Sequence, residues 1–203
     1  MDIPIMKLET DGIGYDLLER AIARVQNVPG AFLEIGTRKG GSMQIIIDAA
    51  IATGQDRVFV SVDPYGHIPY NDGRGITRYD YTNEMKTRAL ADLYNYAHVR
   101  GVNLITFTLE DIYFFALFPK GFPVYEIERR REDRFAFAFL DGPHDVDSLV
   151  RQFLYLVDKT EKGAQVVVDN IDLFDVNELI EYIYPGAWEE VERNSQKICF
   201  TRT

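Results

Sequence analysis

The chain has 203 residues, a hydrophobic fraction of 46% and a net charge of -10 at pH 7, which suit one globular domain over residues 1–203. The negative charge argues against duplex nucleic acid or an anionic membrane surface as a partner. No apolar run is long enough to span a bilayer, no signal peptide is visible, and the only cysteine is Cys199, so we expect a cytoplasmic protein.

Strands and helices are expected to alternate along the chain. Residues 1–29 form a predicted N-terminal helical segment, whose helix over 15–25 has Thr10 or Asp11 as candidate caps. Strands are predicted over 31–36, 57–63, 103–111, 135–141 and 164–170, and helices over 42–54, 83–97, 145–163 and 176–184. Two strands without a helix between them, 188–194 and 197–203, close the chain. The segments 64–82 and 119–134 are predicted to be irregular.

This order predicts an α/β fold, a Rossmann-like sheet of seven mostly parallel strands with helices on both faces. The strands "VFVSV", "FAFAFL" and "VVV" are continuously apolar, as strands covered on both sides are. The closing strands are expected to form an antiparallel pair at the edge of the sheet.

Acidic residues follow each predicted parallel strand. They are Glu34, Asp63, Glu110 with Asp111, Asp141, and Asp169 with Asn170. Asp and Asn also favour strand ends for structural reasons alone, but five such ends in succession weaken that explanation. Ligands of open parallel sheets bind outside the carboxyl ends of the strands, so these residues predict a site.

The loop "EIGTRKGGS" lies between the first strand and its helix. It matches neither the dinucleotide fingerprint G-x-G-x-x-G nor the phosphate loop G-x-x-x-x-G-K-[ST]. A carboxylate before the first glycine opposes an anionic ligand and suits a cationic amino group, while Asp63 could accept ribose hydroxyls. S-adenosylmethionine fits both requirements. The predicted cofactor-binding residues are Glu34, Gly36, Thr37, Arg38, Gly40, Ser42, Asp63, Glu110 and Asp111.

The motifs "FLEIGTRKGGS", "VSVDPYG", "FLDGPHD" and "VVVDN" resemble those of class I S-adenosylmethionine-dependent methyltransferases over about residues 30–203. The chain is most similar to metal-dependent small-molecule O-methyltransferases of the catechol and macrolide-sugar types. The resemblance implies that Asp141, Asp169 and Asn170 hold Mg²⁺ or another hard divalent cation. It also implies that His144 is a catalytic base beside Asp141.

The chemistry is consistent with that resemblance, since a metal-bound hydroxyl loses its proton more readily and a nearby imidazole can accept it. We therefore expect methyl transfer to a hydroxyl of a small molecule, a sugar or a phenol. Two alternatives stay open: a non-catalytic binding subunit of the same fold, and a nicotinamide-dependent oxidoreductase, which the glycine spacing disfavours. The sequence leaves a homo-oligomer open.

Overall fold

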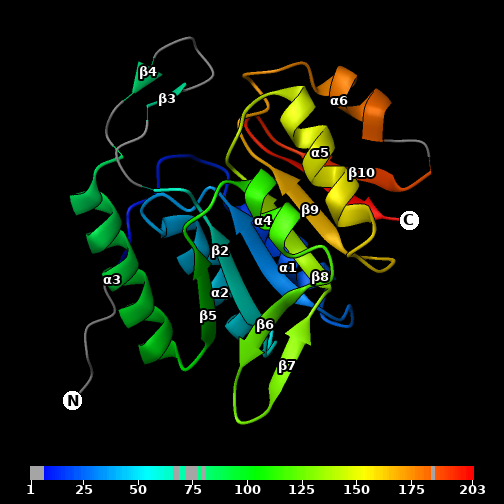
Figure 1. The fold of residues 1–203 in the computed structure, drawn as a ribbon. Coiled ribbons are helices and arrows are strands. Elements are labelled where there is room, and N and C mark those ends of the chain that lie inside the picture. The colour runs from blue at the N-terminus through cyan, green and yellow to red at the C-terminus, as the bar shows by residue number, and fades with distance from the viewer. Residues whose placement is uncertain (1–6, 66–68, 72–76, 79–80, 184–185) are drawn as a thin grey trace.

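A computed structural model of the chain describes residues 7–65, 69–71, 77–78, 81–183 and 186–203. Its centre is a seven-stranded sheet in the order β10-β11-β9-β8-β1-β2-β5 (Figure 1). These strands are β1 (Ala31–Ile35), β2 (Val58–Val62), β5 (Asn103–Phe107), β8 (Phe135–Leu140), β9 (Gln165–Val168), β10 (Trp188–Arg193) and β11 (Ile198–Arg202). All neighbours from β5 to β9 run parallel, and β11 is antiparallel to both β9 and β10. The predicted Rossmann-like sheet with its closing antiparallel pair is confirmed.

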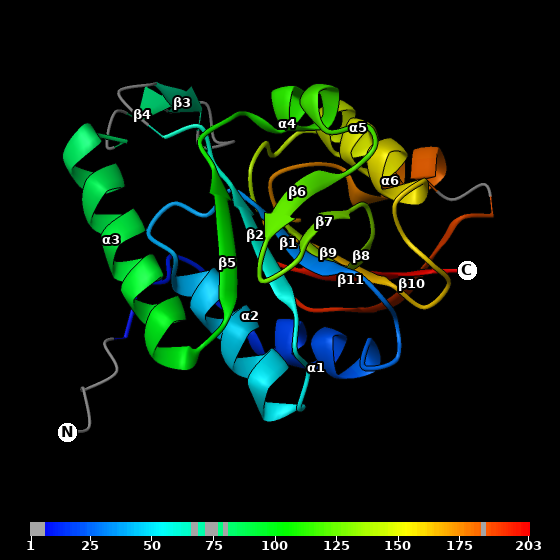
Figure 2. The same ribbon diagram turned by 60° about the horizontal axis from the view of Figure 1, so that its bottom comes forward.

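Helices cover both faces of the sheet, as Figure 2 shows. One layer consists of α1 (Asp16–Arg24), α2 (Gly41–Ala52) and α3 (Asn83–Arg100). The other consists of α4 (Asp111–Leu117), α5 (Val146–Val157) and α6 (Val176–Ile183). Among the described residues, no helix has the length and apolar character needed to cross a membrane.

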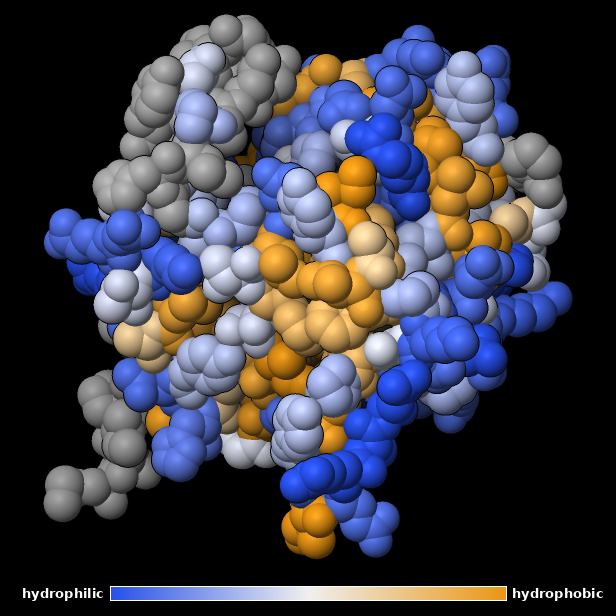
Figure 3. All heavy atoms as spheres, in the orientation of Figure 1, coloured by the Kyte–Doolittle hydropathy of each residue, from blue (hydrophilic) through white to orange (hydrophobic). Residues whose placement is uncertain are grey.

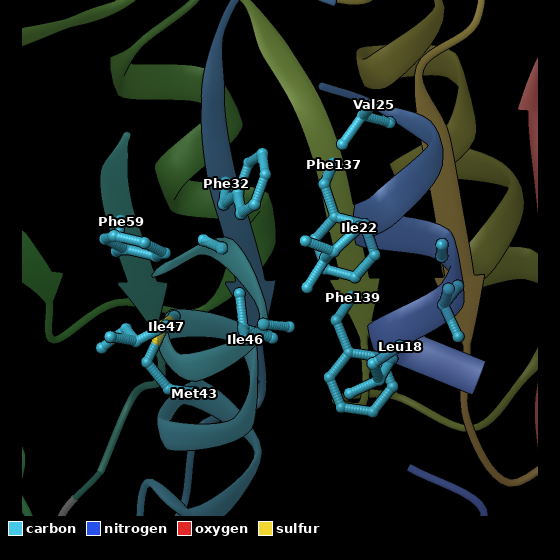
Figure 4. Close-up of a cluster of buried hydrophobic side chains, with 14 of the residues drawn as sticks. Leu18, Ile22, Val25, Phe32, Met43, Ile46, Ile47, Phe59, Phe137 and Phe139 are labelled. Atoms are coloured by element: carbon cyan, nitrogen blue, oxygen red, sulfur yellow. The ribbon is translucent and has the colours of Figure 1, made fainter. Parts of the chain in front are cut away.

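The core on the α1–α2 side is built from aromatic strand residues and aliphatic helix residues (Figure 4). Phe32 and Phe59 on neighbouring strands pack edge to face, with their ring centres 5.8 Å apart. The ring centres of Phe32 and Phe137 are 5.5 Å apart. Leu18 and Met43 are fully buried against this strand surface. Burial of each such side chain contributes about 1.5–3 kcal/mol to folding.

Hydrophobic residues also gather on the face of the molecule that carries α4 (Figure 3). Ile112, Tyr113 and Leu117 of this short helix are exposed, while Phe114 is fully buried. The helix layer on this side of the sheet therefore leaves part of its apolar surface accessible to solvent.

Three sequence predictions of local structure were wrong. The strand predicted over 103–111 ends at Phe107, and the chain then forms α4. The segment 119–134 is not irregular but contains the hairpin of β6 (Phe122–Tyr125) and β7 (Arg129–Glu132), because Phe122 and Val124 alternate into the core. Neither Thr10 nor Asp11 caps α1, whose N-cap is Tyr15.

The segment 64–82 lies partly outside the described residues. Its described part includes two short antiparallel strands, β3 (Tyr70–Asn71) and β4 (Thr77–Arg78).

Gly36 fixes how the ends of β1 and β8 meet. Its φ is +88°, and a Cβ atom added there would lie 2.2 Å from the backbone oxygen of Asp141. Asp141 N–H donates to the Ile35 carbonyl at 2.8 Å, which joins the two segments. Gly36 N–H donates to the carbonyl of Val62, at the end of β2, at 2.9 Å. Only glycine combines this left-handed backbone with so close an approach.

We therefore expect Gly36→Ala to lower the free energy of unfolding by about 3 kcal/mol or more, because backbone strain and a steric clash add. Gly54→Ala is the matched control: Gly54 has a φ of +71° but no atom within 4 Å of an added Cβ. The control should cost only the strain, about 1 kcal/mol. Urea unfolding of both variants measures the difference, and equal losses would contradict the steric explanation.

Candidate functional site

A cavity of about 840 Å³ opens at the carboxyl edge of the parallel strands. Its walls come from the loops that follow β1, β2, β5, β8 and β9, and from the segment before α1. The predicted site residues that line it are Gly36, Arg38, Asp63, Glu110, Asp111, Asp141, His144, Asp169 and Asn170. Parallel pairing thus brings together residues that are far apart in the chain.

The loop between β1 and α2 is held by polar contacts beneath the cavity. The buried Thr37 hydroxyl lies 2.7 Å from that of Ser61, and Arg38 N–H donates to Asp63 at 2.9 Å. Gly40 caps α2 in a left-handed conformation and packs against Leu93, away from the cavity. Thr37 and Ser42 line a much smaller pocket beside the main cavity.

Glu34 lies under this loop and is fully buried, with 0% of its surface exposed. Neither carboxylate oxygen has a hydrogen-bond partner in the part of the chain that the structure describes. Burial raises the pKa of Glu34 to about 8, and the nearby Ser42 and Thr37 oppose this shift only in part. Its side chain does not line the main cavity, in contrast to the other acids of the site.

Asp63 lies at the end of β2, where its two carboxylate oxygens accept the N–H groups of Arg38 and Tyr65, each at 2.9 Å. The residue is almost fully buried, and burial raises the pKa of Asp63 while the backbone donors oppose the shift. Each carboxylate oxygen keeps a second lone pair, so Asp63 can still accept hydroxyl groups from a ligand.

Glu110 and Asp111 lie at the start of α4 rather than in a strand, because the strand ends at Phe107. Glu110 is the N-cap of the helix, and Asp111 accepts a hydrogen bond from Gln152 of α5 at 2.7 Å. This contact joins α4 to α5 at the rim of the cavity.

The turns after β8 and β9 meet as the sequence predicts. Asn170 donates from Nδ2 to Asp141 Oδ1 at 3.3 Å, and its φ of +54° is a left-handed conformation that asparagine tolerates. Burial, together with the negative charge of Asp169, raises the pKa of Asp141 well above its usual range. The two carboxylates and the amide form one cluster, which we call the acid cluster.

Lys197 is a member of this site that the sequence did not indicate. Its ammonium group is fully buried and donates to Asp169 Oδ1 at 2.8 Å and to the Ile13 carbonyl at 2.9 Å. The position is the residue before β11, and only the pairing of β11 with β9 brings it beside Asp169. No local sequence pattern could have shown this, because the two residues meet through a long-range strand pairing.

A divalent cation does not fit the acid cluster as it is arranged. The donors are hard oxygens of the kind that Mg²⁺ prefers, but one oxygen of Asp169 already accepts the Lys197 ammonium and the Asn170 N–H. Asn170 presents its Nδ2 rather than its oxygen to Asp141.

His144 follows Asp141 by three residues and lines the same cavity. Burial lowers the pKa of His144, and the negative charges of Asp169 and Asp11 oppose that shift. Its imidazole is therefore neutral near pH 7 and able to accept a proton. Asp145, the next residue, caps α5 by accepting the Ser148 N–H at 2.8 Å.

The segment before α1 was also missed as part of the site. Asp11 pairs with Arg38 at 2.7 Å and Glu9 pairs with Lys39 at 2.6 Å, so the segment is bound to the glycine-rich loop. A Cβ atom on Gly41 would lie 2.3 Å from the Glu9 carbonyl oxygen. A glycine at that position lets the segment lie directly on the start of α2, beside the cavity.

The buried carboxyl of Glu34 leads to a prediction on stability. Its pKa is about 8 when folded and near its ordinary value of 4.5 when unfolded, so the folded state binds the extra proton. The stability that this proton supplies is complete below pH 4.5 and is lost as the pH rises to about 8. Glu34→Gln should therefore unfold at a higher temperature than the parent at pH 8, and at a similar temperature at the acid end.

Thermal unfolding across this pH range measures the effect, which we expect to reach a few kcal/mol at alkaline pH. Glu19→Gln is the control, because it removes the same charge from an exposed position on α1. A Glu34→Gln variant that is less stable than the parent at pH 8 would contradict the burial argument.

Three comparisons relate the chain to known proteins. A family model described as a methyltransferase domain matches residues 33–171. No curated protein matches the chain.

Similar solved structures share the fold at low sequence identity. The O-methyltransferase TomG from Streptomyces achromogenes, in complex with SAM, has 14% identity and a TM-score of 0.55, over 95% of this chain and 82% of TomG. Cofactor-bound Rv0187 from MTB has 14% identity and a TM-score of 0.57, over 97% and 84% of the two chains. Apo CalS11, a TDP-rhamnose 3'-O-methyltransferase of calicheamicin biosynthesis, has 17% identity and a TM-score of 0.54, over 92% and 77%.

Proposed function

Because the chain belongs to the family of methyltransferase domains, it is an S-adenosylmethionine-dependent methyltransferase, and we propose that its acceptor is a hydroxyl group of a small sugar-like or phenol-like molecule. The observation that carries this proposal is that Gly36, Asp63 and His144 line the same cavity. A cavity of about 840 Å³ is in the range that holds a cofactor and a small acceptor together.

The residues at the edge of the sheet fit S-adenosylmethionine. Asp63 has the free lone pairs to accept ribose hydroxyls, and Gly36 of the glycine-rich loop lines the same cavity. The acidic lining suits a ligand with a cationic amino group and a sulfonium, and Glu34 adds negative charge directly below the loop at alkaline pH. When bound, this cofactor supplies an activated methyl group.

The proposed role of His144 is general base. A neutral imidazole nitrogen accepts the proton of the acceptor hydroxyl, which makes the acceptor oxygen a better nucleophile. The charges of Asp169 and Asp11 then stabilise the imidazolium that forms, as their effect on the His144 pKa indicates. The Mg²⁺ assistance predicted at Asp141, Asp169 and Asn170 does not fit the contacts of these residues, and no step here depends on it.

Two observations bear on the acceptor atom and on the cellular setting of the protein. TomG and CalS11, which share the fold of this chain, are O-methyltransferases by name, and this supports transfer of the methyl group to oxygen. Cys199 is free and buried, which agrees with the cytoplasmic placement that we propose.

Calorimetric titration with S-adenosylmethionine tests the cofactor site first. We expect micromolar affinity for the parent protein and an affinity at least about tenfold weaker for Asp63→Asn, because an amide nitrogen cannot accept ribose hydroxyls. Asp175→Asn is the matched control, since Asp175 is outside the cavity and contacts N–H groups at the start of α6. Absence of binding by the parent protein would contradict the proposed function.

His144→Ala should lower the rate of methyl transfer by about 100-fold or more, because a positioned base contributes that much. Affinity for S-adenosylmethionine should change little. In the parent, the rate should rise with pH and reach its upper plateau with a midpoint below about pH 6.5, since burial lowers the pKa of His144. A variant that keeps the parent's rate and pH profile would exclude His144 as the base.

A further inference from the structure

Lys197 is placed as a fixed cation inside the site. Besides its hydrogen bonds to Asp169 and the Ile13 carbonyl, its Nζ lies 4.3 Å from the ring centre of Tyr15 and 5.8 Å from that of Phe139. Both ring faces attract a cation. Gly12 permits this arrangement, because a Cβ on Gly12 would lie only 3.3 Å from Nζ.

The ammonium group of Lys197 balances part of the negative charge that the carboxylates place at the edge of the sheet. Asp141 and Asp169 lie close together, and the negative charge of Asp11 also acts on Asp141. Buried carboxylates are costly unless a positive charge is nearby, and Lys197 lowers the pKa of Asp141 against these effects. The acid cluster therefore has a cation of its own, provided by the chain.

A divalent metal at the same carboxylates would have to share Asp169 with this ammonium group. The Lys197 Nζ is 2.8 Å from Asp169 Oδ1, so a metal ligated by this carboxylate would lie within a few ångströms of a buried like charge. Because Lys197 and Asp169 are both buried, solvent screens the repulsion at that distance only weakly, and the second cation is disfavoured.

We propose that the Lys197 ammonium takes the place of the divalent cation in this protein. Its hydrogen bond to Asp169 Oδ1 holds this side chain in place in the cavity that His144 also lines, so Lys197 acts through Asp169 as a positioning residue. The positioning role of Lys197 in catalysis rests on the proposed methyl transfer, whereas the exclusion of a divalent metal by Lys197 does not depend on that function.

Mn²⁺ titration of the full chain, followed by electron paramagnetic resonance, tests the metal claim directly. The parent protein should show no stoichiometric site at millimolar Mn²⁺. Stoichiometric binding that disappears in Asp141→Asn would overturn the proposal. This measurement needs no variant of Lys197, so it remains decisive if such a variant fails to fold.

Lys197→Met tests the cause. Removal of the ammonium should raise the affinity for Mn²⁺ at least about tenfold, because two carboxylates then lack a counter-charge. Lys159→Met is the matched control: Lys159 is half-buried, contacts the Pro119 carbonyl and is outside the cavity, so its loss should leave Mn²⁺ binding unchanged. A folded Lys197→Met variant with no gain in affinity would contradict the proposed exclusion of metal.

Titration of S-adenosylmethionine in the presence of chelator separates this proposal from the proposed function. Binding with unchanged affinity in chelator supports both, and binding that requires Mg²⁺ overturns the role of Lys197. If S-adenosylmethionine does not bind under any condition, the proposed function fails, while the Mn²⁺ titration still decides whether Lys197 excludes the metal.

Discussion

The parallel pairing of β1 with β8 is the constraint on which the site depends. Ile35 is in register with Leu140, so the two strands end at the same level, and Gly36 then passes within van der Waals distance of the Asp141 backbone. The glycine-rich loop and the acid cluster are neighbours because of this contact. A side chain at Gly36 would separate the two halves of the cavity, the half that suits the cofactor and the half that contains His144.

Burial gives the carboxylates of the site different properties. Glu34 has no hydrogen-bond partner among the described residues and holds its proton into the neutral range. Asp63 accepts hydrogen bonds from two backbone N–H groups, and Asp169 accepts one from the Lys197 ammonium group. The same residue type therefore provides a group that tends to be neutral, a hydrogen-bond acceptor and a member of an ion pair. Local environment, rather than the number of acids, decides the chemistry available at this edge of the sheet.

Most of the fold and half of the site could be predicted from local sequence. Apolar runs that end in an acid predict both a buried strand and the residue at its tip, which is why Asp63, Asp141 and Asp169 lie at one edge. The helix α4 was missed because seven residues give little periodicity, and the β6–β7 hairpin because Pro123 interrupts its apolar alternation. Lys197 could not be predicted, since its neighbours depend on a pairing between strands that are distant in the sequence.

That long-range pairing has a consequence for how the protein is made. Lys197 contacts the Ile13 carbonyl across 184 residues, so this contact between the segment before α1 and the acid cluster forms only when β11 joins the sheet. A growing chain that has not yet reached β11 exposes an acid cluster with no internal counter-charge. Contacts of such sequence separation form slowly. The acid cluster should therefore gain its counter-charge only after β11 pairs with β9, and not in an earlier folding intermediate.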